Sequence, residues 1–311
     1  MKAGKAMNRH SAIARMALPL LVGALACGEA AVAQQATLAI TPPKAEAQAS
    51  LPVQAVGANI NITPRRVIFD RTKRTEAVYV FNQGTTPVTV DVALVDNAML
   101  PSGEIVPVAR LGERGAQDLA ARVQSARPML LAAPSRLTLP PGQGRTVRVR
   151  ATLPEGGNAA EYRSHLTVTT IPAADSGLTA EQAAAAEKGE LVLRIQSVFG
   201  ISIPLIVRSG EPDATGSIGP ISATSSRDGP ALLVPLLRKG STSLYGNIEL
   251  RTAKEVVGIV RGVAVYAEAD ERTAVVPLLR PLRKGETVTA IYTTDDVGKS
   301  APIATGTYTA P

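Results

Sequence analysis

The chain has 311 residues, of which 45% are hydrophobic and 3% are aromatic, and its formal net charge is +7. This length exceeds the needs of one β-sandwich and fits two domains. Because the basic residues are spread along the chain and few aromatic rings are available to stack on bases, the composition excludes a typical nucleic-acid-binding protein.

The first 33 residues have the pattern of a secretory signal peptide. Basic residues precede an apolar run from Met16 to Ala26, and Ala31-Val32-Ala33 supplies small residues at the two positions that a signal peptidase reads. The run is too short for a bilayer, which takes roughly 20 residues, so we expect export and no stable membrane insertion. Cys27 is the only cysteine, and lipoprotein processing at Cys27 is the alternative. Cleavage leaves 29 basic and 25 acidic residues, a balance of +4.

Residues 34–57 are rich in Ala, Pro and Gln without a sustained period, which predicts a disordered leader. Apolar and polar residues then alternate with the period of a β-strand, most clearly from Val88 to Val95. Shorter stretches of this kind are Val78–Phe81, Thr146–Arg150, His165–Thr169, Gly262–Tyr266 and Thr287–Tyr292. Turn signals such as Pro140-Pro141-Gly142 separate them. The sequence therefore predicts an all-β fold of immunoglobulin-like β-sandwiches.

A domain boundary is predicted from Arg208 to Pro212, where Ser209-Gly210-Glu211-Pro212 follows the end of a long strand. The expected organisation is a signal peptide (1–33), a leader (34–57), an N-terminal immunoglobulin-like domain (58–208) and a C-terminal immunoglobulin-like β-sandwich domain (209–311). The helix-like segment from Thr179 to Lys188 is short, so we expect a mobile loop there.

The stretch from Leu191 to Val207 has the longest alternation in the chain, with an apolar residue at every odd position except Ser197. Typical strands run about 5 or 6 residues. At about 3.3 Å per residue this one reaches roughly 55 Å, so part of its apolar face is expected to be available to another chain. The alternative is two strands bent at Gly200 or Pro204 and packed within their own domain. Pro204 cannot donate to a ladder, which favours an edge strand.

Five motifs occur in order along the chain: Asn61–Asp70, Val80–Gly84, Arg136–Gly142, Glu161–Ser164 and Leu191–Arg208. Their order and spacing resemble those of the PapD-like periplasmic chaperones that assemble pili in the chaperone-usher pathway. The resemblance covers residues 58–210 and is looser over residues 210–311. It implies two immunoglobulin-like domains set at an angle, with fimbrial subunits held in the cleft until an outer-membrane usher takes them.

In this family the chaperone inserts its edge strand into a subunit that lacks its last strand, a case of β-augmentation. The resemblance places the donor side chains among Leu191, Leu193, Ile195 and Phe199. It also implies that a subunit's terminal carboxylate is gripped by an Arg of the first strand and a Lys of the donor strand. Arg66 occupies the first position, and a guanidinium matches the two oxygens of a carboxylate. Pro204 stands where the Lys is expected.

The candidates to supply the missing cation are Arg208, Arg194 and Arg65, and strand pairing without a second cation is the alternative. Arg208 also has a family counterpart in an interdomain ion pair, for which Glu161 is the possible partner. A structural role for Arg208 is therefore at least as well supported as contact with a subunit.

No catalytic or metal-binding pattern is present, because the sequence contains no HExxH, GxSxG, Walker or GxGxxG motif. We expect no enzyme activity, no metal and no cofactor, and we place His165 at a sheet surface or turn. The leading hypothesis is a periplasmic chaperone whose partners are a fimbrial or pilin subunit and an outer-membrane usher. The alternative is a structural or adhesive surface component. Such subunits usually carry a donor extension at the start of the chain, whereas the long alternating strand here lies mid-chain.

Overall fold

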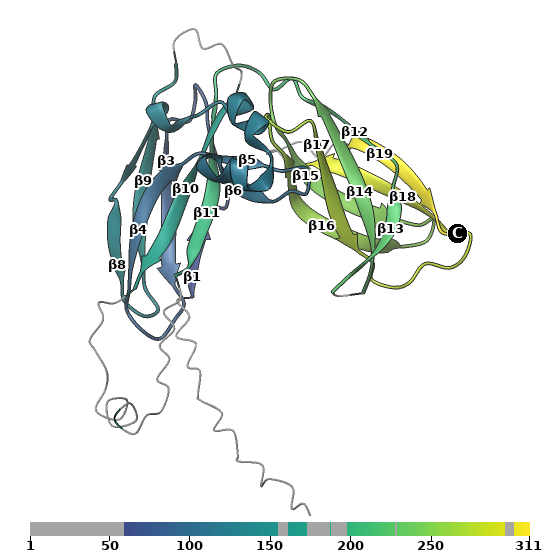
Figure 1. Cartoon of the computed structure of the whole chain (residues 1–311), viewed down its shortest axis with the longest axis horizontal. Coiled ribbons are helices and arrows are strands. Elements are labelled where there is room, and N and C mark those ends of the chain that lie inside the picture. The colour runs from purple at the N-terminus through teal and green to yellow at the C-terminus, as the bar shows by residue number, and fades with distance from the viewer. Residues whose placement is uncertain (1–58, 155–160, 173–186, 188–197, 228, 296–301) are drawn as a thin grey trace, which may run out of the picture. The chain divides into compact units, whose positions relative to one another are not determined.

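The computed structural model describes residues 59–154, 161–172, 187, 198–227, 229–295 and 302–311 (Figure 1). Residues 1–58 lie outside the described residues. The predicted signal peptide with Cys27, the predicted leader and the helix-like segment, apart from Glu187, also lie outside them. The described part is dominated by strands, which confirms the predicted all-β class.

The first β-sandwich has one sheet of order β1-β3-β9-β7 and one of order β2-β11-β10-β4-β8. Its strands are β1 Ile60–Thr63, β2 Val67–Phe69, β3 Thr75–Asn82, β4 Val88–Val95, β7 Leu130–Ala133, β8 Arg136–Leu139, β9 Gly144–Ala151, β10 Glu161–Ile171 and β11 Gly200–Arg208. Alternate apolar side chains meet between the sheets, and Phe69, Val80, Leu139, Leu166 and Leu205 are fully buried. Each such burial contributes about 1.5–3 kcal/mol. Packing of this kind holds the sandwich together in a chain that has only one cysteine.

The motif Asn61–Asp70, in which the resemblance places the first strand, is divided between the two sheets. β1 pairs antiparallel with β3, whereas β2 pairs in parallel with β11. The division falls at Pro64, which has no N–H to donate to a continuing ladder. Arg66, just after the division, is thereby brought next to β11.

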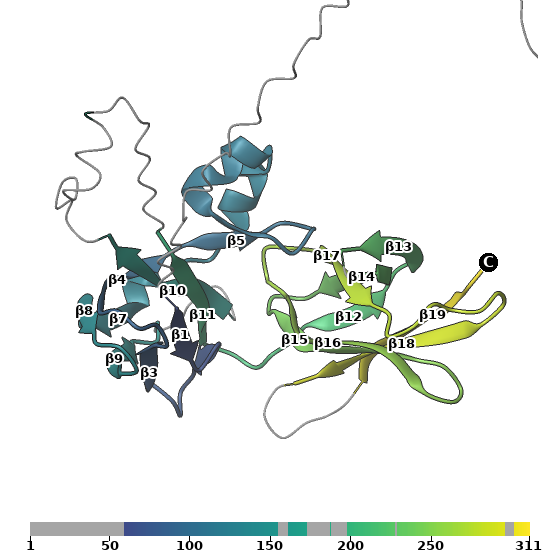
Figure 2. The same cartoon turned by 90° about the horizontal axis from the view of Figure 1, so that it is seen from below.

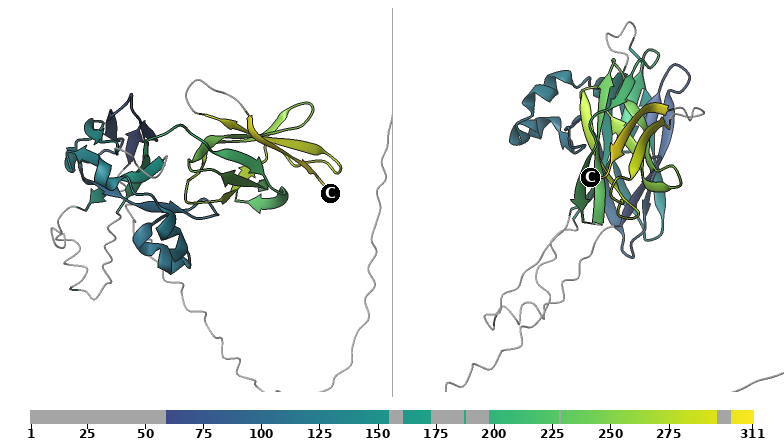
Figure 3. Two further views of the ribbon diagram at one scale, coloured as in Figure 1. Left: turned by 90° about the horizontal axis from the view of Figure 1, so that it is seen from above. Right: turned by 90° about the vertical axis from the view of Figure 1, so that its right-hand side faces the viewer.

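The second β-sandwich has one sheet in which β14 pairs with β12, β13 and β17, and one of order β16-β15-β18-β19. Its strands are β12 Thr215–Ile218, β13 Ser222–Ser226, β14 Gly229–Lys239, β15 Leu244–Arg251, β16 Val256–Val265, β17 Glu271–Pro277, β18 Thr287–Thr294 and β19 Pro302–Thr309. The two sheets form separate layers in Figures 2 and 3. Leu232, Leu236, Ile248 and Tyr292 are fully buried between them.

Between β4 and β7 the chain forms an insertion that the sequence patterns did not indicate. It consists of the hairpin β5 (Asn97–Met99) and β6 (Ile105–Pro107) and the 3₁₀ helices η1 (Val108–Arg114), η2 (Gln117–Arg122) and η3 (Arg127–Met129). Figure 2 shows the coiled ribbons of the insertion next to β5. Short 3₁₀ helices lack the 3.6-residue period of an amphipathic α-helix, so apolar spacing gives no signal for them. In the described part of the chain, no helix is long and apolar enough to cross a bilayer.

Candidate functional site

One flank of β11 is only partly covered by its own sheet. β10 pairs with β11 from Gly200 to Arg208, whereas β2 pairs only with residues 205–207. Among the residues that the structure describes, no strand covers this second flank between Gly200 and Pro204. Main-chain groups at such an edge are available to a strand of another chain.

The inward-facing side chains of β11 pack within their own domain. Ile203, Leu205 and Val207 are buried in the interior of the first sandwich. The later half of the long predicted strand therefore has no apolar face to spare, and the home-packed alternative holds for it. The parts of β11 that remain available to another chain are its uncovered edge and the residues that precede the strand.

Phe199, immediately before β11, is the predicted donor residue that the structure places. Its side chain is 41% exposed, and its N–H donates to Oγ1 of Thr170 at 2.9 Å. The other three predicted donors, Leu191, Leu193 and Ile195, lie outside the described residues. Phe199 thus combines a fixed backbone with an accessible aromatic side chain.

A small apolar hollow of about 110 Å³ opens beside Phe199. It is lined by Asn59, Ile60, Val168, Phe199, Gly200 and Ile201. Ile60 begins β1, which is an edge strand of the facing sheet. The hollow therefore lies between two sheet edges.

A larger cleft of about 1130 Å³ is lined by residues of 66–73 and 208–212 and by Tyr245, Thr294 and Asp295. Arg66 is half-buried in it and stacks on Tyr245, with 4.2 Å from the guanidinium Cζ to the ring centroid. Stacking engages the face of a guanidinium, whereas carboxylates bind to its in-plane N–H groups. The cleft therefore contains a group suited to carboxylate recognition.

The register of β2 and β11 places Arg66 beside Pro204. Val67 pairs with Leu205 in a parallel ladder, so Arg66 and Pro204 each lie one residue before it on neighbouring strands. A cation at position 204 would stand next to Arg66, and proline supplies none.

Arg208, one candidate replacement, is engaged by Glu161. Nε of Arg208 donates to Oε2 of Glu161 at 3.1 Å, and both side chains are buried. The two residues face each other on β11 and β10, so the ion pair lies within one sandwich. Oε2 of Glu161 also accepts the N–H of Ser243, in the second sandwich, at 3.3 Å.

An interdomain role of the Arg208–Glu161 pair stays a prediction, supported by the Ser243 contact. Arg65 is exposed, and Arg194 lies outside the described residues.

The outward face of β10 is joined to the second sandwich by residues that the sequence analysis missed. Arg163 donates to both carboxylate oxygens of Glu268, at 2.7 and 3.0 Å, and the two side chains are 5% and 3% exposed. The guanidinium Cζ of Arg163 also lies 3.6 Å from the ring centroid of Tyr266. A polar residue in an alternating strand normally faces water, so the alternation does not indicate this burial.

The expectation that His165 lies at a sheet surface or turn was wrong. His165 is 2% exposed, and its ring meets that of Tyr266 edge-on, with 6.2 Å between the centroids. Burial lowers the pKa of His165 to about 3, and the charge of Arg163 adds to the effect. The imidazole is therefore neutral and enclosed at physiological pH, out of reach of a surface ligand.

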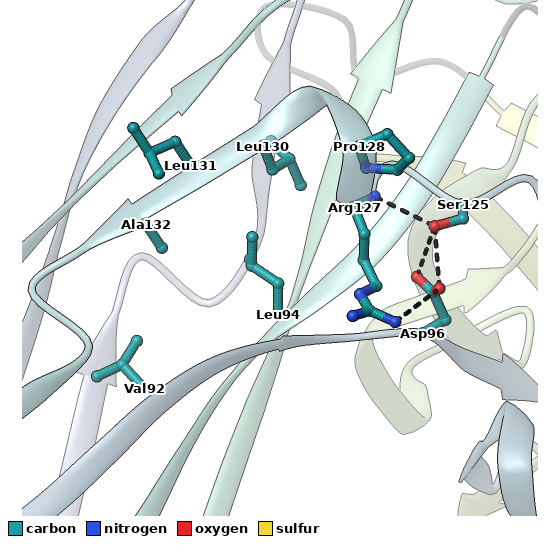
Figure 4. A pocket seen from close by; sticks show the side chains of 9 residues that line it. All are labelled: Val92, Leu94, Asp96, Ser125, Arg127, Pro128, Leu130, Leu131 and Ala132. Atoms are coloured by element: carbon teal, nitrogen blue, oxygen red, sulfur yellow. Dashed lines mark hydrogen bonds and ion pairs between the residues drawn. The ribbon is translucent and has the colours of Figure 1, made fainter.

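A further hollow of about 570 Å³ lies between β4 and β7. Figure 4 shows apolar side chains along it and Asp96, Ser125 and Arg127 gathered at one end. Asp96 accepts hydrogen bonds from Ser125 at 2.9 and 3.0 Å and from Ser164 at 2.6 Å, and Arg127 lies 3.9 Å away. Because these polar groups bind one another, the hollow is a weaker candidate site for an ionic ligand than the cleft at Arg66. Over the described ranges, no group of three or more His, Cys, Asp or Glu side chains is placed to hold a metal ion.

The fold and the cleft define the class of protein: two immunoglobulin-like β-sandwiches with an open strand edge that leads to an arginine in a cleft. No family model matches the sequence, and no curated protein matches it.

Several solved structures are similar to the chain. The CupB2 chaperone of Pseudomonas aeruginosa has 13% identity, over 81% of this chain and 100% of that chain, with a TM-score of 0.40. The chaperone DraB of E. coli has 15% identity, over 82% and 98%, with a TM-score of 0.38. A chain of the Salmonella enterica SafA pilin in complex with the SafB chaperone has 12% identity, over 81% and 97%, with a TM-score of 0.41. At these low scores, the function has to be inferred from the sequence motifs and the geometry of the chain itself.

Proposed function

We propose that this protein is a periplasmic chaperone that binds fimbrial subunits by lending them a β-strand and delivers them to an outer-membrane usher. The observation that carries the proposal is the uncovered flank of β11 between Gly200 and Pro204. The exposed Phe199 lies at one end of this flank, and Arg66 lies at the other. A strand edge between an apolar anchor and a carboxylate-binding group suits the terminal strand of an incomplete subunit.

The two ends of the flank set the direction of the bound strand. A terminal carboxylate at Arg66 places the end of the subunit chain beside Pro204. Phe199 is five residues away, about 16 Å along an extended strand. Since β11 also runs from Phe199 toward the cleft, the subunit strand pairs with β11 in parallel. Further donor side chains belong before Phe199, where the sequence predicts Leu191, Leu193 and Ile195.

Co-expression with the subunits encoded by neighbouring genes, followed by pull-down, tests the proposal. We expect a one-to-one complex with the wild-type chain, and no complex with Phe199→Asp, because only the bound state buries that side chain. Leu279→Asp is the matched control, since Leu279 is an exposed apolar residue of the second sandwich, outside β11 and the cleft. Failure of the wild-type chain to capture any of these subunits would contradict the proposal.

The location of the protein separates the proposal from the structural or adhesive alternative. A chaperone is recovered from the periplasmic extract, with or without its subunit. Recovery of the chain as a component of purified surface appendages would support the alternative.

A further inference from the structure

The cleft around Arg66 is not uniformly basic. Its lining holds four cations, Arg66, Arg71, Lys73 and Arg208, and three acids, Asp70, Glu211 and Asp295. Arg208 forms an ion pair with Glu161, and Lys73 forms one with Glu76. A carboxylate therefore gains little from the overall charge of the cleft, and the direction in which a guanidinium points decides whether it binds.

Tyr245 lies where it can set the direction of Arg66. The guanidinium stacks on its ring at 4.2 Å. Tyr245 belongs to β15 of the second sandwich, where it pairs with Ala264 across the ladder, and its carbonyl accepts the N–H of Asp295 at 3.2 Å. The backbone that carries the ring is thus held on both sides.

The ring of Tyr245 is held in place as well. It packs against a cluster of Met99, Ala264 and Tyr266. A Cβ atom at Gly262 would lie 3.1 Å from the Tyr245 hydroxyl, and Gly262 has a φ of +67°, which favours glycine. Both the close approach and the backbone conformation therefore call for glycine at position 262. The ring face that Tyr245 presents to Arg66 is a fixed surface.

We infer that Tyr245 is a positioning residue of the carboxylate anchor: it stacks on Arg66 and fixes the plane of its guanidinium at the cleft, in place of the second cation that Pro204 cannot supply. This inference rests on the proposed chaperone function. A guanidinium that is already oriented loses less freedom when it binds a carboxylate than a mobile one does. The second sandwich then takes a direct part in recognising the subunit, although the donor strand belongs to the first.

Two synthetic peptides test the inference: the carboxy-terminal strand of a captured subunit as the free acid and as the amide. Charged hydrogen bonds predict that the wild-type chain binds the free acid about tenfold or more tightly than the amide. Tyr245→Leu should reduce this acid-over-amide preference by a factor of about 3 to 30, the range expected for a stacked guanidinium. Tyr245→Phe should keep it, because the ring face remains.

Two further variants complete the design. Arg66→Lys keeps the charge without the planar face and should also lose most of the preference. Tyr79→Leu is the matched control, because Tyr79 is an exposed tyrosine of β3 that does not line the cleft, and it should bind like the wild-type chain.

The outcomes distinguish the inference from the function on which it rests. An unchanged preference in Tyr245→Leu, or an equal loss in Tyr245→Phe, would overturn the positioning role. The amide peptide reports on strand pairing alone, so its binding should be the same for the wild-type chain and Tyr245→Leu. Absence of binding of both peptides to the wild-type chain would instead contradict the chaperone proposal.

Discussion

Arg163 of β10 and Glu268 of the second sandwich form a buried ion pair in which two guanidinium nitrogens contact both carboxylate oxygens. Oε1 of Glu268 also accepts the N–H of Met99 at 2.8 Å, and Nη2 of Arg163 donates to the carbonyl of Asn97 at 2.7 Å. The pair therefore connects three parts of the chain: β10, the β5–β6 hairpin and the second sandwich.

Removing one member of this ion pair should destabilise the fold, because the other charge then stays buried without a partner of opposite charge. We expect Arg163→Met to lower the free energy of unfolding by about 3–5 kcal/mol. The double variant Arg163→Met, Glu268→Gln should cost less than the sum of the single variants, since glutamine still accepts from Met99 and carries no charge. Urea unfolding of all four proteins in a double-mutant cycle measures the coupling.

Arg110→Met is the control, because Arg110 and Glu113 form an exposed pair that contributes little to stability. Additive effects at Arg163 and Glu268 would contradict this expectation.

His165 should make the protein less stable in acid. Its pKa is about 3 in the fold, against 6.5 as the ordinary value. Between these values the unfolded chain binds a proton that the folded chain does not, so the free energy of unfolding falls as pH falls below 6.5. We expect His165 to account for a loss of about 2 kcal/mol between about pH 8 and about pH 5. His165→Leu should remove that part of the pH dependence in urea unfolding. The same pH dependence in both proteins would contradict the expectation, because it would show that the folded and unfolded chains bind protons equally at His165.

Gly246, in the middle of β15, should not tolerate a side chain. An added Cβ would collide with the main-chain oxygen of Thr293 and lie 2.9 Å from its carbonyl carbon, and a backbone neighbour cannot move aside cheaply. We expect Gly246→Ala to lower the free energy of unfolding by about 1–3 kcal/mol, the usual cost of overpacking. At Gly112 in η1 no atom lies within 4 Å of an added Cβ, so Gly112→Ala should change stability by less than about 0.5 kcal/mol. Similar thermal unfolding of the two variants would count against this steric explanation.

The period of two in the sequence predicted the strands well, because it depends only on neighbouring residues. The range Val88–Val95 is β4 with the same bounds, and the other predicted stretches lie on β3, β9, β10, β16 and β18, with Tyr266 just beyond β16. Local patterns contain no information about contacts between distant parts of the chain. The stack of Arg66 on Tyr245 joins positions 179 residues apart in two sandwiches. No sequence motif predicts this contact. The burial of Arg163 and His165 has the same origin, since alternation identifies the polar side of β10 but not what covers it.

The covering of β10 has a consequence for how the protein can be divided. In an isolated first sandwich, the polar side of β10 would be exposed to solvent. In the whole chain this side carries the buried imidazole of His165 and the guanidinium of Arg163, which pairs with Glu268 of the second sandwich. A fragment that ends at the linker would expose His165 and Arg163 to solvent and would lack their contacts with the second sandwich. We therefore expect the two sandwiches to unfold together in one cooperative transition, and a fragment that ends at the linker to be less stable than the whole chain.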